Sequence, residues 1–201
     1  MNDDQRIADI LAYWFDELDQ HGVCSPRQHQ LWFQSRPETD AHIEACYGEM
    51  VEAARSGGLD HWAEQPDGLM ALVLLLDQFT RNICRGTGGA FAGDGKALAL
   101  VQNAVANGVD RDMPTIHRVF LYIPYEHSEA LAAQEQGIAL FDQLLRDCSE
   151  QVRAEVDRYR DYSVAHRDVI ASFGRFPHRN RILGRESTTA EQAHLAKRGG
   201  F

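Results

Sequence analysis

The chain of 201 residues lacks both a membrane-spanning segment and the alternating pattern of a β-strand. Its longest apolar run covers residues 69–76, whereas a helix that spans a bilayer needs about 20 residues. Strict alternation never extends beyond four positions, and no hairpin turn signal separates two apolar runs. The N-terminus is acidic and has no apolar segment of the signal-peptide type behind it. We therefore expect a helical, cytoplasmic protein without a membrane partner.

Cysteine and histidine are present but not clustered, and no short cofactor motif occurs. Cys24, Cys46, Cys84 and Cys148 lie far apart without a CxxC pair, which predicts reduced packing residues rather than a disulfide framework. The nine histidines form no HExxH motif, so we predict no metal site. P-loop, GxGxxG and GxSxG motifs are also absent. The sequence therefore predicts no bound cofactor.

Lysine is nearly absent, and the charges are unevenly spread. Of the 20 basic residues, 18 are arginine, which reflects either composition bias or a functional preference. Residues 1–80 carry 15 acidic against 4 basic side chains, within a net charge of −10. Because this N-terminal half is acidic, it would repel the phosphates of a nucleic acid, and we expect no nucleic-acid partner. Residues 158–185 carry seven arginines against two aspartates, which leaves room for a small basic pocket.

Helical periodicity accounts for nearly the whole chain and predicts one all-α domain over residues 1–201. Residues 67–82 are apolar on all sides for two turns, so they are expected to form the buried central helix. Helices joined by short loops suit antiparallel hairpins stacked together. The expected helices cover residues 2–18, 27–34, 39–55, 67–82, 94–107, 114–122, 128–148 and 150–173, and a capping box at 188–191 begins a last short one.

The stretch 170–187 runs from a helix end into a turn that is dense with hydrogen-bond donors. Its candidate ligand-binding residues are Arg175, His178, Arg179 and Asn180. Arg presents a rigid fork of donors that fits a carboxylate or a phosphate, so this stretch is a candidate anion site. Aromatic and aliphatic residues between the donors predict that the loop packs onto the domain.

The end of the expected central helix carries charged residues that are also candidate ligand-binding groups. Asp77 and Arg81 are four residues apart and share a face, and Arg85 follows one turn later. An unpaired buried charge costs several kcal/mol, so these charges must be paired or line a cavity. Two interpretations stay open: a buried ion pair to the next helix, or a pocket.

Further polar candidates lie in two later segments. Residues 118–129 contain Arg118, Tyr122, His127 and Glu129. Pro124 is expected to interrupt the helix there, and Ser128 to cap a new one whose free N–H groups would attract an anion. On the helix 150–173, Tyr159, Tyr162 and His166 share a face, where His166 is either a hydrogen-bonded core residue or a base.

Three long motifs together resemble a known bacterial family. They are LLLDQFTRNICRGT at 74–87, FLYIPYEHSE at 120–129 and HRDVIASFGRFPHRNRILGRES at 166–187. In this order they resemble the family called domain of unknown function 924. The resemblance implies an all-α fold similar to tetratricopeptide-repeat proteins, made of stacked antiparallel hairpins, and it implies no activity. Thr80, Cys84 and Tyr125 depart from the family's usual residues at packing or turn positions.

Three functions remain open at this point. The first is a pocket for a small anion-bearing ligand (a phosphate ester, nucleotide or carboxylate) on which all the polar candidates converge. Its candidate catalytic residues are His127, His166 and Glu129, with a histidine as general acid or base. The second is a scaffold that holds a peptide or protein partner on a concave helical face. The third is a buried ion-pair network that only fixes packing. Homo-oligomer formation is left open.

Overall fold

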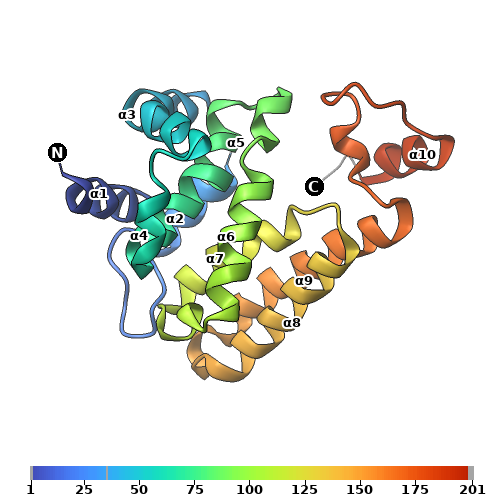
Figure 1. The fold of residues 1–201 in the computed structure, drawn as a ribbon. Coiled ribbons are helices and arrows are strands. Elements are labelled where there is room, and N and C mark those ends of the chain that lie inside the picture. Colours follow the sequence, from blue (N-terminus) through green and yellow to red (C-terminus); the bar gives the residue numbers. More distant parts are fainter. Residues whose placement is uncertain (1, 35, 199–201) are drawn as a thin grey trace.

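The computed structural model describes residues 2–34 and 36–198 and confirms the all-α fold. Apart from a single β-bridge between Leu18 and Cys24, the described residues form helices, turns and loops. Figure 1 shows the N-terminal helices at the left, α8 and α9 side by side at the lower right, and α10 at the upper right. No helix in this part of the chain is both long enough and apolar enough to cross a membrane.

The first part of the chain packs around the central helix. It consists of α1 (Asp3–Phe15), α2 (Pro26–Phe33) and α3 (Pro37–Ser56), and α1 and α3 contact the central helix directly. Asn2 caps α1, and its side chain forms a capping box with Gln5. α1 ends three residues earlier than expected, because Asp16 adopts a φ of 58° that a right-handed helix excludes.

The central helix is a continuous stretch whose hydrogen-bond pattern changes in the middle. α4 (Pro66–Val73) passes into a π-helical segment, Leu74–Phe79, and then into α5 (Thr80–Ile83). Residues 69–77 are all buried, which confirms the predicted central position. π-helical turns widen the backbone spiral and are frequent at functional sites. This one carries Asp77.

The remaining helices cover the central helix and extend it on one side. They are α6 (Asp94–Ala106), α7 (Thr115–Glu126), α8 (Leu131–Asp147), α9 (Glu150–Phe173) and α10 (Thr189–Arg198). α8 contacts both α7 and α9, and a two-residue connection makes α8 and α9 an antiparallel hairpin (Figure 1). Short 3-10 turns occupy Asp60–Glu64, Gly88–Phe91, Val109–Asp112 and Pro177–Arg179.

Two expectations about the connection between α7 and α8 are wrong. Pro124 does not interrupt α7, which continues to Glu126. A proline removes only one hydrogen bond of the helix, and the packing of this buried turn against its neighbours outweighs that loss. Ser128 does not cap a helix, since α8 begins only at Leu131. The Ser128 hydroxyl instead accepts a hydrogen bond from the Ala130 N–H at 3.2 Å. The expected anion site at this helix N-terminus therefore lacks its cap.

The cysteines only partly follow the prediction of packing residues. All four are free: Cys24 is buried, Cys84 and Cys148 are half-buried, and Cys46 is exposed. The packing role is therefore wrong for Cys46, which lies on the outer face of α3. The similarity to tetratricopeptide-repeat proteins stays a prediction.

Candidate functional site

A cavity of about 470 Å³ lies where α2, α5, α7 and α9 meet, and we call it the His127 pocket. Three of the predicted site residues, Arg81, His127 and His166, line it together. The predicted face of α9 is confirmed, because Tyr159, Tyr162 and His166 all face the cavity. Its other lining residues are His29, Phe33, Gln78, Ile123, Glu126, Glu155 and Arg158.

The floor of the His127 pocket contains an Asp–His pair. Asp77 is 1% exposed, and its Oδ1 accepts a hydrogen bond from His127 Nδ1 at 2.7 Å. Oδ1 also accepts from Arg81 Nη1 at 3.0 Å, and Gln78 donates to Oδ2 at 2.6 Å. Burial favours the neutral acid, but Arg81 and His127 outweigh it and hold the pKa of Asp77 below its ordinary value.

The same contacts define the state of His127. Burial and the positive charge of Arg81 lower the pKa of His127, against the opposing effect of Asp77. The ring is therefore neutral at pH 7. Because Nδ1 donates its proton to a carboxylate, the lone pair of the neutral ring resides on Nε2. Among the described residues Nε2 has no hydrogen-bond partner, so it is the atom that His127 offers to a ligand.

A second layer of charge holds Arg81 in place. Its guanidinium pairs with Asp77 on one side and with Asp94 on the other, at 2.8 Å. Arg179 pairs with the same Asp94 at 3.2 Å and stacks between the rings of Phe91 and Phe176, at 4.4 and 4.5 Å. Arg179 thus lies behind Arg81, and the C-terminal segment supports the pocket indirectly.

Glu126 is a buried carboxyl group on the α7 side of the pocket. Ser163 Oγ donates to Glu126 Oε1 at 2.6 Å, and His166 Nδ1 lies 3.8 Å from Oε2. Burial is the main effect and raises the pKa of Glu126 to about 8, with a further contribution from the charge of Asp77. Glu126 is therefore mainly protonated at pH 7, beside a neutral His127.

The turn after α7 fixes the relative positions of Glu126 and His127. The buried Gln134 donates two hydrogen bonds from its Nε2, to the Glu126 carbonyl at 2.6 Å and to the Ser128 carbonyl at 2.7 Å. This contact satisfies carbonyl groups that the end of α7 leaves without helical partners. Gln134 therefore holds the turn in the shape that directs both side chains into the pocket.

His166 faces His127 across the cavity. The two ring centroids lie 6.5 Å apart, and His166 Nδ1 donates to the Tyr162 carbonyl at 2.9 Å. Burial lowers the pKa of His166 to about 4, so this ring is also neutral at pH 7. The pocket thus combines two neutral imidazoles with one protonated carboxyl group.

The rim of the His127 pocket is aromatic and carries a cation. Phe33 and Tyr162 are 64% and 59% exposed, an unusual exposure for large side chains. Arg158 also lines the rim, and no carboxylate within the described chain forms an ion pair with it. Glu155, in contrast, is paired with His29 at 2.9 Å.

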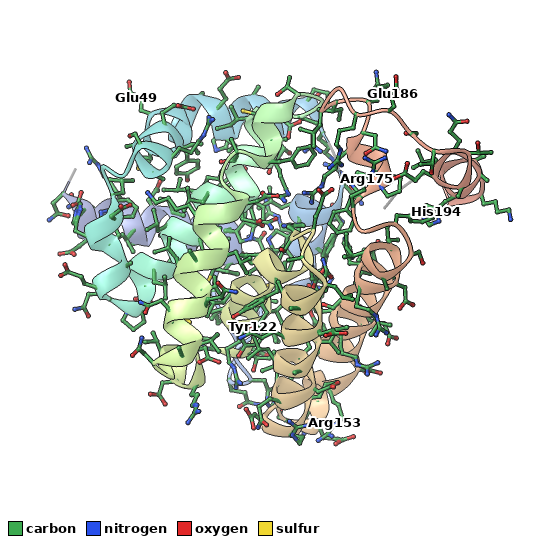
Figure 2. The ribbon with its side chains drawn as sticks, turned by 45° about the vertical axis from the view of Figure 1, so that its right-hand side comes forward. Glu49, Tyr122, Arg153, Arg175, Glu186 and His194 are labelled. Carbon is green, nitrogen blue, oxygen red and sulfur yellow. The ribbon has the colours of Figure 1, made fainter. Side chains whose placement is uncertain are left out.

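Several other predicted candidates do not converge on this pocket, and the expectation of one shared hollow is wrong for them. Arg118 and Tyr122 line a different cavity. Arg85 pairs with Asp40 at the surface. Figure 2 shows Tyr122 in the middle of the helical body and Arg175 in the C-terminal segment, well apart. The physical reason is ion pairing: Arg85, Arg118 and Arg175 each pair with a carboxylate on a different neighbouring element, namely Asp40, Asp147 and Glu191.

The C-terminal loop packs down as predicted, but its donors serve internal contacts. Arg175 pairs with Glu191 at 2.6 Å, and Arg185 pairs with Glu129 at 2.7 Å. Two further contacts complete the loop, from Asn180 Nδ2 to Ser187 Oγ at 3.1 Å and between the rings of His178 and Phe176 at 5.5 Å. Glu129 is therefore a structural anchor in this geometry, and its predicted catalytic role is untested.

Reasoning from the sequence missed several residues of the site, among them Arg158, Glu126, Gln134 and Ser163. Glu126 carries a readable signal, because it ends an apolar segment that must be buried, and a charge there needs the same explanation as Asp77. Gln134 and Ser163 carry no such signal. Their partners are a turn backbone and a side chain on another helix, which only the folded chain brings near.

Comparisons with known proteins agree with the helical fold and with the family that the three motifs resemble. The model of a family described as bacterial protein of unknown function (DUF924) matches residues 10–199. A solved structure, described as a protein of unknown function from Agrobacterium tumefaciens, is 33% identical with a TM-score of 0.82. The match covers 98% of this chain and 99% of that chain. No curated protein matches.

Proposed function

The chain belongs to the bacterial DUF924 family, and since that membership assigns no activity, we propose one from the His127 pocket. The protein binds a small organic molecule with an aromatic or apolar body and an anionic group. It transfers protons on this ligand, with His127 as general base and Glu126 as general acid.

The observation that carries the proposal is that an unprotonated base, His127, and a protonated acid, Glu126, lie in the same pocket at pH 7. Asp77 orients His127 at 2.7 Å so that an unprotonated Nε2 is presented to the ligand. The adjacent Glu126 keeps its proton at pH 7, because burial raises its pKa to about 8. Surroundings that shift the pKa values of two neighbouring groups in opposite directions are typical of acid–base sites.

The lining of the pocket supports the ligand class. Phe33, Tyr159 and Tyr162 offer ring faces and edges for an apolar or aromatic body. Arg158 at the rim is a cation without an ion-pair partner in the described chain, and a carboxylate or phosphate is its natural complement. Arg81 is already shared between two aspartates, so we assign the anion to Arg158.

The two alternative functions fit these observations less well. A peptide scaffold needs exposed aromatic residues along a face, but Trp14 and Trp62 are buried, and the exposed Phe33 belongs to the pocket. A purely structural network needs no remaining space beside its charges. Here a cavity of about 470 Å³ adjoins Arg81 and His127.

The experiment uses ring-bearing anions as probes and reads the histidine side chains by NMR. Benzoate and phenyl phosphate are titrated against ¹⁵N-labelled protein, with benzyl alcohol as the uncharged control. We expect saturable shifts of the His127 and His166 ring signals with the anions, and at least tenfold weaker binding of the alcohol. His127 Nε2 should have the shift of an unprotonated nitrogen at pH 7.

Two variants on α9 sharpen this test. Arg158→Ala should weaken binding of the anions about tenfold, the loss of one charge-assisted hydrogen bond. Arg153→Ala, an exposed residue of the same helix outside the pocket, should bind like the wild type. The proposal is wrong if the anions leave the His127 signals unchanged, if both variants behave alike, or if Nε2 carries a proton at pH 7.

A further inference from the structure

A second cavity of about 430 Å³ lies at the opposite end of α7. It is bounded by α6, α7, α8 and the turn Val109–Asp112, and it shares no lining residue with the His127 pocket. Its lining residues are Val105, Asp110, Arg111, Arg118, Tyr122, Leu140, Gln143 and Asp147. The proposed function makes no use of this cavity.

A buried guanidinium faces this second cavity with one nitrogen unused. The Arg118 side chain is 7% exposed. Its Nε donates to Tyr122 Oη at 3.2 Å, and its Nη2 donates to Asp147 Oδ2 at 3.0 Å. Among the described residues Nη1 has no hydrogen-bond partner, yet it is not sealed within the protein. The remaining place for Nη1 is the cavity that Arg118 lines, so a donor of a buried cation is available there.

The carboxylates of the second cavity are used unequally. Both oxygens of Asp147 are engaged, by Arg118 and by Gln143 Nε2 at 2.6 Å. Asp110 is 4% exposed, and its Oδ2 accepts the Tyr122 hydroxyl at 2.6 Å. The other oxygen of Asp110 has no hydrogen bond within the described chain and is not sealed off from solvent either. One acceptor with negative charge is therefore available beside the donor of Arg118.

Arg111 adds a second cation at the mouth of the cavity. Its guanidinium folds back over Gly108, and no carboxylate in the described part of the chain pairs with it. A self-contained ion-pair network would close over its members and leave neither this charge nor the space. The groups left for a ligand are thus the guanidiniums of Arg118 and Arg111 and one carboxylate oxygen of Asp110.

From this arrangement we propose that the second cavity is a binding site for a small zwitterion, an apolar α-amino acid. The ligand carboxylate lies on Arg118 and Arg111, which together satisfy a planar anion. The ligand ammonium donates to Asp110. Val105 and Leu140 form the apolar wall against which the ligand side chain packs.

The experiment compares one amino acid with its two halves. L-leucine, isopentylamine (no carboxylate) and 4-methylpentanoate (no ammonium) are titrated against the full chain by calorimetry and NMR. We expect saturable binding of L-leucine and at least tenfold weaker binding of both analogues. Other apolar L-amino acids should bind in the same range, and L-aspartate and L-lysine more weakly.

Variants separate this site from the His127 pocket. Arg111→Ala should weaken L-leucine at least tenfold and leave benzoate binding unchanged, whereas Arg158→Ala should do the reverse. Asp110→Asn should weaken L-leucine but not 4-methylpentanoate. Because Asp110 is buried, circular dichroism and an unfolding curve check that the Asp110→Asn variant is folded. Arg118→Lys is the conservative second variant: it keeps the positive charge but loses the planar fork of donors, so it should also weaken L-leucine.

The proposal fails if no apolar amino acid binds to the wild type. It also fails if 4-methylpentanoate binds as tightly as L-leucine, or if Arg111→Ala binds L-leucine unchanged. Because 4-methylpentanoate is also an apolar anion of the class proposed for the His127 pocket, it is compared with L-leucine in the Arg158→Ala variant, and the His127 pocket is tested by its own probes.

Discussion

At the residue scale, Glu126 is the side chain whose surroundings change its chemistry most. Its carboxyl group lies behind Ser163 and near Asp77, with no cation paired to it in the described chain beyond a histidine 3.8 Å away. The protonated form of the carboxyl group is favoured here, because burying an unpaired charge costs far more free energy than burying a neutral acid. The same proton is the one that the proposed reaction uses.

This state of Glu126 predicts a particular dependence of stability on pH. Its folded pKa is about 8, above the ordinary value of 4.5, so the folded state binds more protons than the unfolded state between these values. The stabilisation is complete below pH 4.5 and is lost as the pH rises through 8. Glu126→Gln, a neutral isostere, should remove this loss, which amounts to a few kcal/mol in the wild type.

The measurement is the free energy of unfolding in urea from pH 6.5 to 9 for wild type and Glu126→Gln. Below this range four histidines act in the opposite direction, since burial lowers the pKa of His127 and lowers the pKa values of His117, His166 and His178 to about 4. Their contribution rises with pH up to about 6.5 and is then constant. Parallel curves for the two proteins above pH 6.5 would contradict the assignment.

At the element scale, the decisive contact is between the start of α6 and the π-helical segment. A Cβ on Gly93 would lie 2.1 Å from the Leu76 carbonyl oxygen, so only glycine permits this approach. The approach places Asp94, the next residue, beside Arg81, which in turn reaches Asp77. One glycine thus connects the packing of two helices to the charge network below the pocket.

Replacing this glycine should separate the two elements. We expect Gly93→Ala to destabilise the protein by about 2 kcal/mol or more, because the clash is with backbone and not with a flexible side chain. Gly95→Ala is the matched control two residues later: its Cβ would meet nothing within 4 Å, and alanine should stabilise α6 by about 0.5–1 kcal/mol. Urea unfolding of both variants tests the pair, and equal effects would refute this role of Gly93.

At the scale of the whole molecule, the C-terminal segment 174–198 is attached mainly through charge. The segment adds only Phe176, beside Val169 and Ile170 of α9, to a small apolar cluster separate from the main core. Across the join, Arg185 pairs with Glu129, and Arg179 pairs with Asp94 between two aromatic rings. Figure 1 shows this segment at the upper right, beyond the end of α9.

This attachment predicts that Arg179 controls release of the segment. Arg179→Ala should cost about 2 kcal/mol from the lost ion pair and ring stacking, while Asp94 stays paired with Arg81. It should also speed proteolysis within residues 174–198. Arg181→Ala, an exposed neighbour, should change neither quantity by more than about 0.5 kcal/mol. If both variants resist proteolysis within residues 174–198 equally, Arg179 does not control release of the segment.

Local patterns were sufficient for most of the helices. The apolar run at 69–76 and the capping box at 188–191 are readable because each acts through neighbours within one or two turns. Pro124 shows the limit of such rules. Its preference opposes a helix, but the packing of a buried turn outweighs the loss of one hydrogen bond.

The same distinction between local and tertiary effects applies to the site. The sequence by itself determined an all-α chain and the residues able to carry charge or a proton, because helix periodicity and side-chain chemistry are local properties. Only the tertiary structure decided which of them meet. It brought His127, His166 and Glu126 to one cavity and Arg118 to another, since each buried charge is positioned by a partner far away in sequence.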